Sequence, residues 1–224
     1  AVGLNLLTGW PLLTCALVIS LNVFFMFLLQ ARGMRWLEAG IVALVATIGG
    51  CYLVEIFLAQ PDWSGVLAGL FRPGLSGARV GGDTSDLYVA IGIIGATVMP
   101  HNLYLHSSIV QTRKYEHSPE GRREAIRFAT LDSTVALMSA LFINAAILVV
   151  AAAAFHGRGE VVEEIDRAHE LLSPLLGTAL ASTLFAVALL ASGQNSTLTG
   201  TLAGQIVMEG FLNLRLRGQG ETLA

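Results

Sequence analysis

Charged side chains are scarce in this sequence of 224 residues, where Asp, Glu, Lys and Arg make up 13% of the total, about half their share in an average soluble domain. None occurs from Ala1 to Ala31, and none occurs from Leu171 to Met208. A soluble helix needs polar or charged residues every few positions on its water-facing side, so these runs exclude a water-soluble globule. Hydrophobic residues make up 54% of the chain and the mean hydropathy is +0.67, which is typical of a membrane protein.

Other absences exclude further classes of protein. The net charge is -3 and no basic stripe exists, which excludes a nucleic-acid binder. The hydrophobic content excludes a disordered chain and a coiled coil. The apolar runs are continuous rather than alternating with a period of two, which excludes a porin-like barrel. The two cysteines, Cys15 and Cys51, lie in uncharged apolar runs, so we expect both to be reduced and structural.

Five segments are long enough to cross a hydrocarbon core of ~30 Å, which takes about 20 helical residues. We place these spans near residues 10–30, 37–59, 86–110, 131–155 and 173–208. The last segment is too long for one perpendicular span, so we expect it to tilt or to bend near residues 192–194. The chain opens on Ala1 in an apolar stretch without a visible signal peptide. The odd number of spans and this start predict a partial transmembrane domain over residues 1–224, a piece of a larger helix bundle.

The third span carries helix-breaking residues at its middle, where Gly92, Gly95 and Pro100 lie close together. Proline has no N–H to donate and collides with the carbonyl four residues before it, which leaves carbonyls near Ala96 without their helical partners. In hydrocarbon these groups need another partner. A discontinuous helix at the midplane is typical of transporter sites, where freed carbonyls and the negative end of a half-helix hold a cation. A proline kink satisfied by neighbouring Ser and Thr is the alternative, and these residues alone leave both interpretations open.

Met99 and two histidines lie at or after the break. A thioether is a soft, neutral ligand that suits Mn, Fe, Co or Cd better than Ca or Mg, although a Met in an apolar span also serves as packing. His101 and His106 are five residues apart, about 140° around a helix, whereas residues that face one another on a helix lie three or four apart. We therefore expect them not to share one metal ion. Proton transfer or a polar lining suits them better, because imidazole changes charge near neutral pH.

Further polar and small residues in or near the spans have structural explanations. Glu55 lies one turn from the outer end of its span, where its side chain can reach the interface. Asp132 starts the fourth span at the cytoplasmic side and can cap that helix. Gly200 and Gly204 form a Gly-x-x-x-Gly spacing, which is typical of a packing face. The Gly-rich loop over residues 61–83 is expected to be irregular.

Two longer motifs resemble a known family. Residues 95–106, Gly-Ala-Thr-Val-Met-Pro-His-Asn-Leu-Tyr-Leu-His, closely resemble the sixth-helix motif of the Nramp/MntH divalent metal transporters, and residues 193–211 resemble the transport motif after their helix eight. The resemblance covers the whole chain, from the end of helix three through helix eight. It implies an all-α membrane protein that forms part of a LeuT-like inverted-repeat helix bundle, with five complete spans and a broken third span. It also implies proton-coupled import of Mn or Fe, with Cd or Co as further ions, by alternating access in the cell (inner) membrane.

The resemblance also assigns roles to individual residues. It implies that the Ala96 carbonyl and the Met99 sulfur are metal ligands, and that His101 and His106 line the proton or inward pathway. In the transport motif it points to Gly193, Gln194, Asn195, Thr197, Gly200 and Gly204, with Asn195 in place of the commoner Ser. The family's remaining ligands, the Asp and Asn of an Asp-Pro-Gly-Asn motif, do not occur in this sequence, so the chain would supply half of the metal site. Its partners would be the metal ion, protons, the lipid bilayer and the missing helices of the same protein, with no cofactor and no nucleic acid.

Two other functions compete with metal import. A LeuT-type cation-coupled symporter of an organic solute such as an amino acid would use the same broken helix, but it also needs a second half-helix N-terminus for the carboxylate. Met99 favours the metal over that solute. An intramembrane enzyme would need a nucleophile with a base, or paired acids at one depth, whereas Glu55 and Asp132 lie at opposite ends of their spans. We therefore expect no enzyme activity.

The basic residues are distributed unevenly between the loops, and cytoplasmic loops collect Lys and Arg. Nine follow the first, third and fifth spans: Arg32, Arg35, Arg113, Lys114, Arg122, Arg123, Arg127, Arg215 and Arg217. Four fall in the intervening loops: Arg72, Arg79, Arg158 and Arg167. The first span is therefore expected to run from outside to inside.

This asymmetry predicts that the loop with Arg122 and Arg123 is cytoplasmic and that the loop with Glu163 is external. Single cysteines placed at residues 122 and 163 of a variant without native cysteines, and treated with an impermeant thiol reagent from outside, measure the orientation. We expect labelling at residue 163 alone. Labelling at residue 122 alone would contradict the topology.

Overall fold

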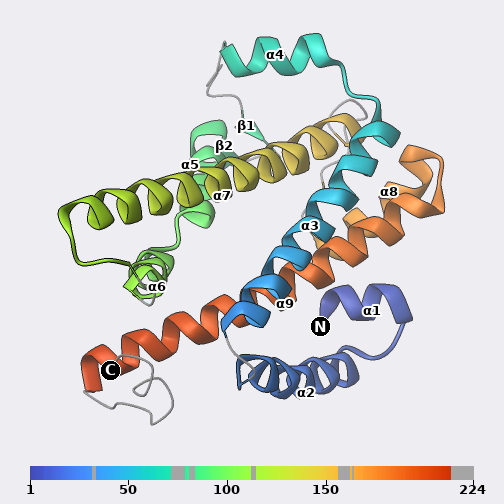
Figure 1. Cartoon of the computed structure of the whole chain (residues 1–224). Helices are drawn as coiled ribbons and strands as arrows, with labels where there is room; N and C mark the ends of the chain where they lie inside the picture. The colour runs from blue at the N-terminus through green and yellow to red at the C-terminus, as the bar shows by residue number, and fades with distance from the viewer. Residues whose placement is uncertain are drawn as a thin grey trace. The chain divides into compact units, whose positions relative to one another are not determined.

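The computed structural model describes residues 1–31, 34–71, 79–80, 84–111, 115–155, 162 and 164–212, and these residues are almost entirely helical. The helices, labelled in Figure 1, are α1 (Val2–Thr8), α2 (Leu12–Ala31), α3 (Met34–Ala59), α4 (Trp63–Phe71), α5 (Asp86–Thr97), α6 (Pro100–Gln111), α7 (Pro119–Ala154), α8 (Ile165–Leu176) and α9 (Ala179–Leu212). Two short strands, β1 (Arg79–Val80) and β2 (Thr84–Ser85), pair antiparallel with Arg79 opposite Ser85. The predicted all-α class is therefore confirmed for the described part of the chain.

The chain divides into two compact units. Unit 1 comprises Ala1–Leu87 and Leu137–Asn195, and unit 2 comprises Tyr88–Ala136 and Ser196–Ala224. Unit 1 has a core in which Val150 and Ala154 of α7 pack with Leu172 of α8 and Ala181 of α9. Partly buried side chains pack against this core: Ile56, Leu58, Phe155, Leu176 and Phe185. Cys15 and Cys51 are buried and unpaired, as expected for structural thiols.

Two of the described helices are long and apolar enough to cross a membrane alone, over Arg35–Ala59 and Pro119–Ala154. Helix α1 and residues Leu12–Leu21 of α2 would form a third span if this pair, bent by 118°, counts as one. The five spans predicted near 10–30, 37–59, 86–110, 131–155 and 173–208 stay a prediction. The segment predicted as 173–208 is divided in the structure, because α8 ends at Leu176 with Gly177 at φ 70° before α9 begins. Only glycine adopts this left-handed conformation readily.

Helix α7 begins well before the apolar stretch that marked the predicted fourth span. The Ser118 hydroxyl accepts the Gly121 N–H at 3.0 Å, and Pro119 occupies the first helical position, where its missing N–H costs nothing. Asp132 therefore lies inside the helix, and the expectation that it caps the fourth span is wrong. The Ser-Pro pair at residues 118 and 119 indicates a helix start in the sequence. Hydropathy detects only the apolar part of a helix, so it missed this start.

The loop over residues 61–83, expected to be irregular, contains helix α4. Asp62 starts this helix, since its carboxylate accepts hydrogen bonds from the Ser64 hydroxyl at 2.7 Å and the Ser64 N–H at 3.0 Å. The Ser64 hydroxyl, followed by the backbone N–H groups of Gly65 and Ser64, holds the pKa of the exposed Asp62 carboxyl below its usual value. An N-terminal cap of this kind satisfies helix donors that otherwise have no partner.

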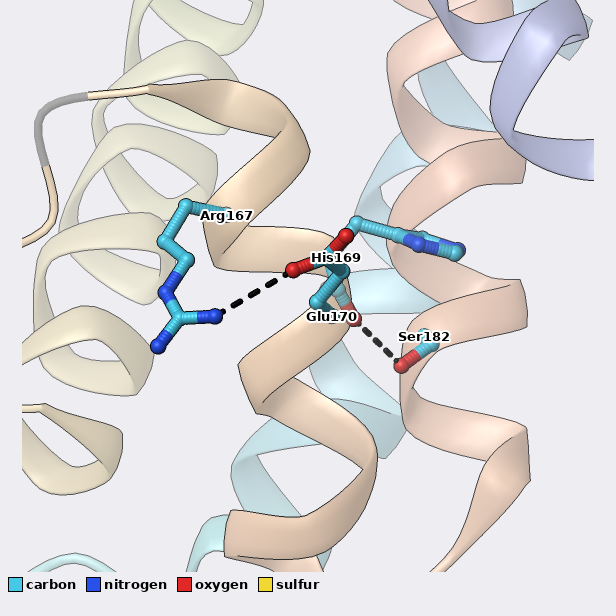
Figure 2. Close-up of polar contacts among 4 residues, drawn as sticks. All are labelled: Arg167, His169, Glu170 and Ser182. Carbon is cyan, nitrogen blue, oxygen red and sulfur yellow. Dashed lines mark hydrogen bonds and ion pairs between the residues drawn. The ribbon is translucent and has the colours of Figure 1, made fainter.

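Helices α8 and α9 are joined by a hydrogen bond that Figure 2 shows in close-up. The Ser182 hydroxyl of α9 donates to the His169 carbonyl of α8 at 2.7 Å, and on α8 itself Arg167 pairs with Glu170 at 3.3 Å. Pro174 lies inside α8 and has no N–H for the Glu170 carbonyl, which weakens the helix at this turn. The bond from Ser182 therefore fastens α8 to α9 close to the weakened turn.

Helix α1 approaches α9 closely at Gly3. A Cβ atom at this position would lie 2.8 Å from the Leu190 nitrogen and 3.1 Å from the Ala186 oxygen, both backbone atoms that cannot rotate away. Small residues at helix contacts allow such backbone approach in membrane bundles. Gly3 is thus required for the packing of α1 within unit 1.

The substitution Gly3→Ala should lower the free energy of unfolding of the full-length protein by about 1–3 kcal/mol, because α1 must move away from α9. Gly50→Ala in α3 is the matched control, since a Cβ there meets nothing within 4 Å, and it should be neutral or stabilising by up to about 1 kcal/mol. Thermal unfolding in detergent measures both variants. Equal stability of the two would contradict the close contact.

Candidate metal centre

The predicted third span is divided into two helices at Val98 and Met99. Helix α5 ends at Thr97 and α6 begins at Pro100, so the two residues between them lie outside helix. The Val98 N–H still bonds to the Ile94 carbonyl at 3.1 Å, which continues α5 by one bond. Pro100 is four residues after Ala96 and has no N–H to give its carbonyl. The structure therefore contains the break that the proline predicted.

The two predicted metal ligands lie beside this break. Ala96 is in the last turn of α5, Met99 lies between the helices, and both are exposed, Met99 by 45%. A carbonyl oxygen and a thioether sulfur are both neutral, and together they accept a divalent ion of intermediate softness. Among the described residues no group of three or more His, Cys, Asp and Glu is placed to hold a metal ion. A metal at this break would thus need further ligands from elsewhere.

Both predicted pathway histidines lie on α6, but only His106 has a described side chain. The His101 side chain lies outside the described residues. His106 Nε2 lies 2.9 Å from the hydroxyl oxygen of Ser133 on α7, and that hydroxyl also donates to the Ala129 carbonyl at 2.8 Å. Ser133 could not be predicted as the partner of His106, because nothing in a single sequence shows which residue of α7 faces α6.

A cavity of about 1020 Å³ opens within unit 2, between the end of α6 and the first half of α7. Four side chains of the acidic or basic residue types line it: Glu116, Arg122, Glu124 and Asp132. Three of the four are acidic, which favours cations over anions in this space. The other lining residues include Val110, Tyr115 and Phe128.

The second predicted motif lies on α9. Its members are Gly193, Gln194, Asn195, Thr197, Gly200 and Gly204, of which Gln194 is 8% exposed. A Cβ at Gly200 or Gly204 would meet nothing within 4 Å, so the described residues do not form the packing face expected of this spacing. One turn further, Gln205 Nε2 donates to Glu209 Oε1 at 3.0 Å.

Glu55 of α3 is buried more deeply than its sequence position suggested. Its exposure is 0%, and neither carboxyl oxygen has a hydrogen-bond partner among the described residues. The expectation that it reaches the interface is therefore wrong in unit 1, where packing encloses it. An isolated ionised carboxylate is far more costly to bury than a neutral carboxylic acid, so this position favours a neutral side chain.

Comparison with known proteins identifies the family. A family model described as "Natural resistance-associated macrophage protein-like" (Nramp) matches residues 1–222. The chain belongs to the Nramp family. The divalent metal cation transporter MntH of Bradyrhizobium diazoefficiens is 62% identical to it over 217 residues, covering 96% of this chain and 47% of that protein. MntH of Xanthomonas campestris pv. campestris is 60% identical, covering 96% of this chain and 48% of that protein.

Solved structures agree with this assignment. The crystal structure of the Eremococcus coleocola manganese transporter, in complex with an aromatic bis-isothiourea substituted compound, matches with a TM-score of 0.84 and 40% identity. The match covers 96% of this chain and 46% of that one. The Nramp chain described here thus spans about half the length of its relatives, which are transporters and not enzymes. The family predicted from the two motifs is confirmed, and with it a helical membrane-protein fold.

The buried carboxyl of Glu55 gives a test of this part of the Nramp chain. In the full-length protein, Glu55→Gln should change the free energy of unfolding by less than about 1 kcal/mol, because it keeps a neutral polar side chain of the same size. Glu55→Lys should cost about 3–5 kcal/mol, since it places an uncompensated charge in the same space. Thermal unfolding in detergent measures both variants. An equal loss for the two would show that Glu55 needs its charge for a partner in the complete protein.

Proposed function

We propose that the protein to which this chain belongs imports divalent transition-metal ions of the Mn and Fe class, coupled to protons, by alternating access in the cell (inner) membrane. The observation that carries the proposal is the break between α5 and α6, in a chain of the Nramp family, with a thioether at the break. Relatives that are divalent metal cation transporters support the metal as the substrate. The chain would supply half of the metal site, in a LeuT-like bundle of inverted repeats with five spans from this part.

Each predicted residue has a place in this mechanism. The Ala96 carbonyl and the Met99 sulfur would bind the transported ion, while His101 and His106 on α6 would serve the proton or inward pathway. The Ala96 carbonyl and the Met99 sulfur are both uncharged. The ion would therefore need further ligands, carboxylates or amides, from elsewhere in the protein. The partners are the metal ion, protons, lipid and the remaining helices of the protein, and the metal is cargo rather than a cofactor.

The alternative of a LeuT-type symporter for an organic solute such as an amino acid is not favoured. The relatives named above transport metal cations. The described residues also place a methionine, not an anion-binding group, between α5 and α6. A thioether offers nothing to a carboxylate.

Met99 is expected to set the ion selectivity. Carbonyl and carboxylate oxygens accept hard and soft cations alike, so the thioether is the one proposed ligand here that disfavours abundant Ca and Mg. Full-length Met99→Ala should keep some Mn transport, lose much of its Cd binding, and gain Ca or Mg transport. The measurement is competitive uptake of Mn, Cd, Ca and Mg into proteoliposomes.

The parent protein in the same assay tests the function itself. It should accumulate Mn, exclude Ca and Mg, and move protons with the metal. Uptake of an amino acid in place of Mn would overturn the metal proposal. If Met99→Ala excluded Ca and Mg as well as the parent does, selectivity would come from cavity size or from other helices, and the role of Met99 would be wrong.

A further inference from the structure

The hydrogen bond between α6 and α7 fixes which nitrogen of His106 carries a proton. His106 Nε2 lies 2.9 Å from Ser133 Oγ, and Ser133 Oγ lies 2.8 Å from the Ala129 carbonyl oxygen. A carbonyl oxygen can only accept, and a serine hydroxyl has a single hydrogen to give. That hydrogen is used on Ala129, so the serine oxygen must accept from the ring. The network therefore assigns the hydrogen of neutral His106 to Nε2 and leaves a lone pair on Nδ1.

We propose that Ser133 is a positioning residue for His106, which holds Nε2–H in place so that the ring takes up and releases protons through Nδ1. The inference rests on the proposed role of His106 in the proton pathway and adds a second residue to it. When a proton arrives, it bonds to the Nδ1 lone pair and the imidazole becomes imidazolium, with no other bond made or broken. When it leaves, it leaves from the same nitrogen.

The same bond serves both charge states of the ring. Nε2 is a donor in the neutral ring and in the cation, so His106 does not have to turn away from Ser133 when it is charged. The bond is stronger from the cation, because hydrogen bonds with an ionised partner are roughly twice as strong as neutral ones. Ser133 itself cannot pass the proton on while its own hydrogen stays on the Ala129 carbonyl. The serine thus limits proton exchange to one side of the ring.

On the two described helices that carry this pair, few neighbours in sequence are ionisable. On α7, the residues one turn from Ser133 are Ala129, Thr130, Ala136 and Leu137, none of which titrates in the working range. Asp132 is next to Ser133 in sequence but about 100° away around the helix. On α6, the titratable residues are His101 and Tyr104, five and two positions before His106. Asp132 is the carboxylate next to the pair in sequence, so it needs its own variant in a test of pH dependence.

The test uses the full-length transporter in proteoliposomes and measures Mn uptake and proton flux between pH 5.5 and 8. Ser133→Ala should shift the midpoint of the pH profile, because the ring is no longer held with Nε2–H toward α7 and can exchange protons through either nitrogen. Ser133→Thr keeps a hydroxyl and should restore the parent profile. Thr134→Ala is the matched control, since Thr134 makes the same bond to a carbonyl one turn back, at 2.7 Å to Thr130. Asp132→Asn measures the contribution of the neighbouring carboxylate.

A second measurement is independent of transport. Nitrogen-15 spectra of histidine-labelled protein at pH 8, with His106 identified by its absence in His106→Ala, should show a protonated Nε2 and an unprotonated Nδ1. In Ser133→Ala the two tautomers should mix. A parent ring protonated at Nδ1 would overturn the inference directly, even if Ser133→Ala is too poorly folded to assay.

The two measurements separate this inference from the proposed function. If His106→Ala leaves the pH profile unchanged, the proton role of His106 is wrong, and the role of Ser133 falls with it whatever the tautomer. If His106→Ala alters the profile while Ser133→Ala behaves like Thr134→Ala, only the positioning role is overturned. A shifted profile in Ser133→Ala, its rescue in Ser133→Thr and an Nε2–H ring together support it.

Discussion

The candidate site depends on one constraint, which is that proline has no N–H to give to the carbonyl four residues before it. Pro100 has no N–H for the Ala96 carbonyl. Helix α5 ends at Thr97 and α6 begins at Pro100. In a continuous helix the Ala96 carbonyl would accept a hydrogen bond from the N–H of residue 100, which proline lacks. Met99 places a sulfur atom in the same stretch. The two proposed cation ligands, both uncharged, thus depend on a break in the backbone rather than on acidic side chains.

Hydroxyl side chains in these helices mostly satisfy carbonyls one turn back on their own helix. Thr97 bonds to Ile93 at 2.8 Å, Ser107 to Leu103 at 2.7 Å, and Thr134 to Thr130 at 2.7 Å. Such bonds satisfy the hydroxyl within its own helix and do not connect one helix to another. Ser133 makes the same local bond, and its hydroxyl oxygen also lies 2.9 Å from His106 Nε2. The local bond is what fixes the direction of the second, since it uses up the hydroxyl hydrogen.

Features set by a few neighbouring residues could be predicted from the sequence, and features set by distant contacts could not. The break followed from Pro100 because proline acts within four residues. The start of α7 at Pro119 is also set by neighbouring residues. It was missed only because the fourth span was placed by hydropathy and not by capping residues. The burial of Glu55 and the partner of His106 depend on which faces of separate helices meet, and a single sequence contains no measure of that. The family could be predicted from two long motifs, because a motif is recognised by the identity of its residues and not by their geometry.

The two units differ in how far their helices are packed by side chains of the same unit. In unit 1, Gly3 lets α1 reach the backbone of α9, and the core around Val150 and Leu172 is closed by side chains of the same unit. In unit 2, Met99 is 45% exposed, and no Cβ contact is recorded at Gly200 or Gly204. Helices in a membrane associate through close packing and polar contacts rather than through exclusion of water. Met99, Gly200 and Gly204 are therefore positions against which further helices can pack, and the chain spans about half the length of its relatives.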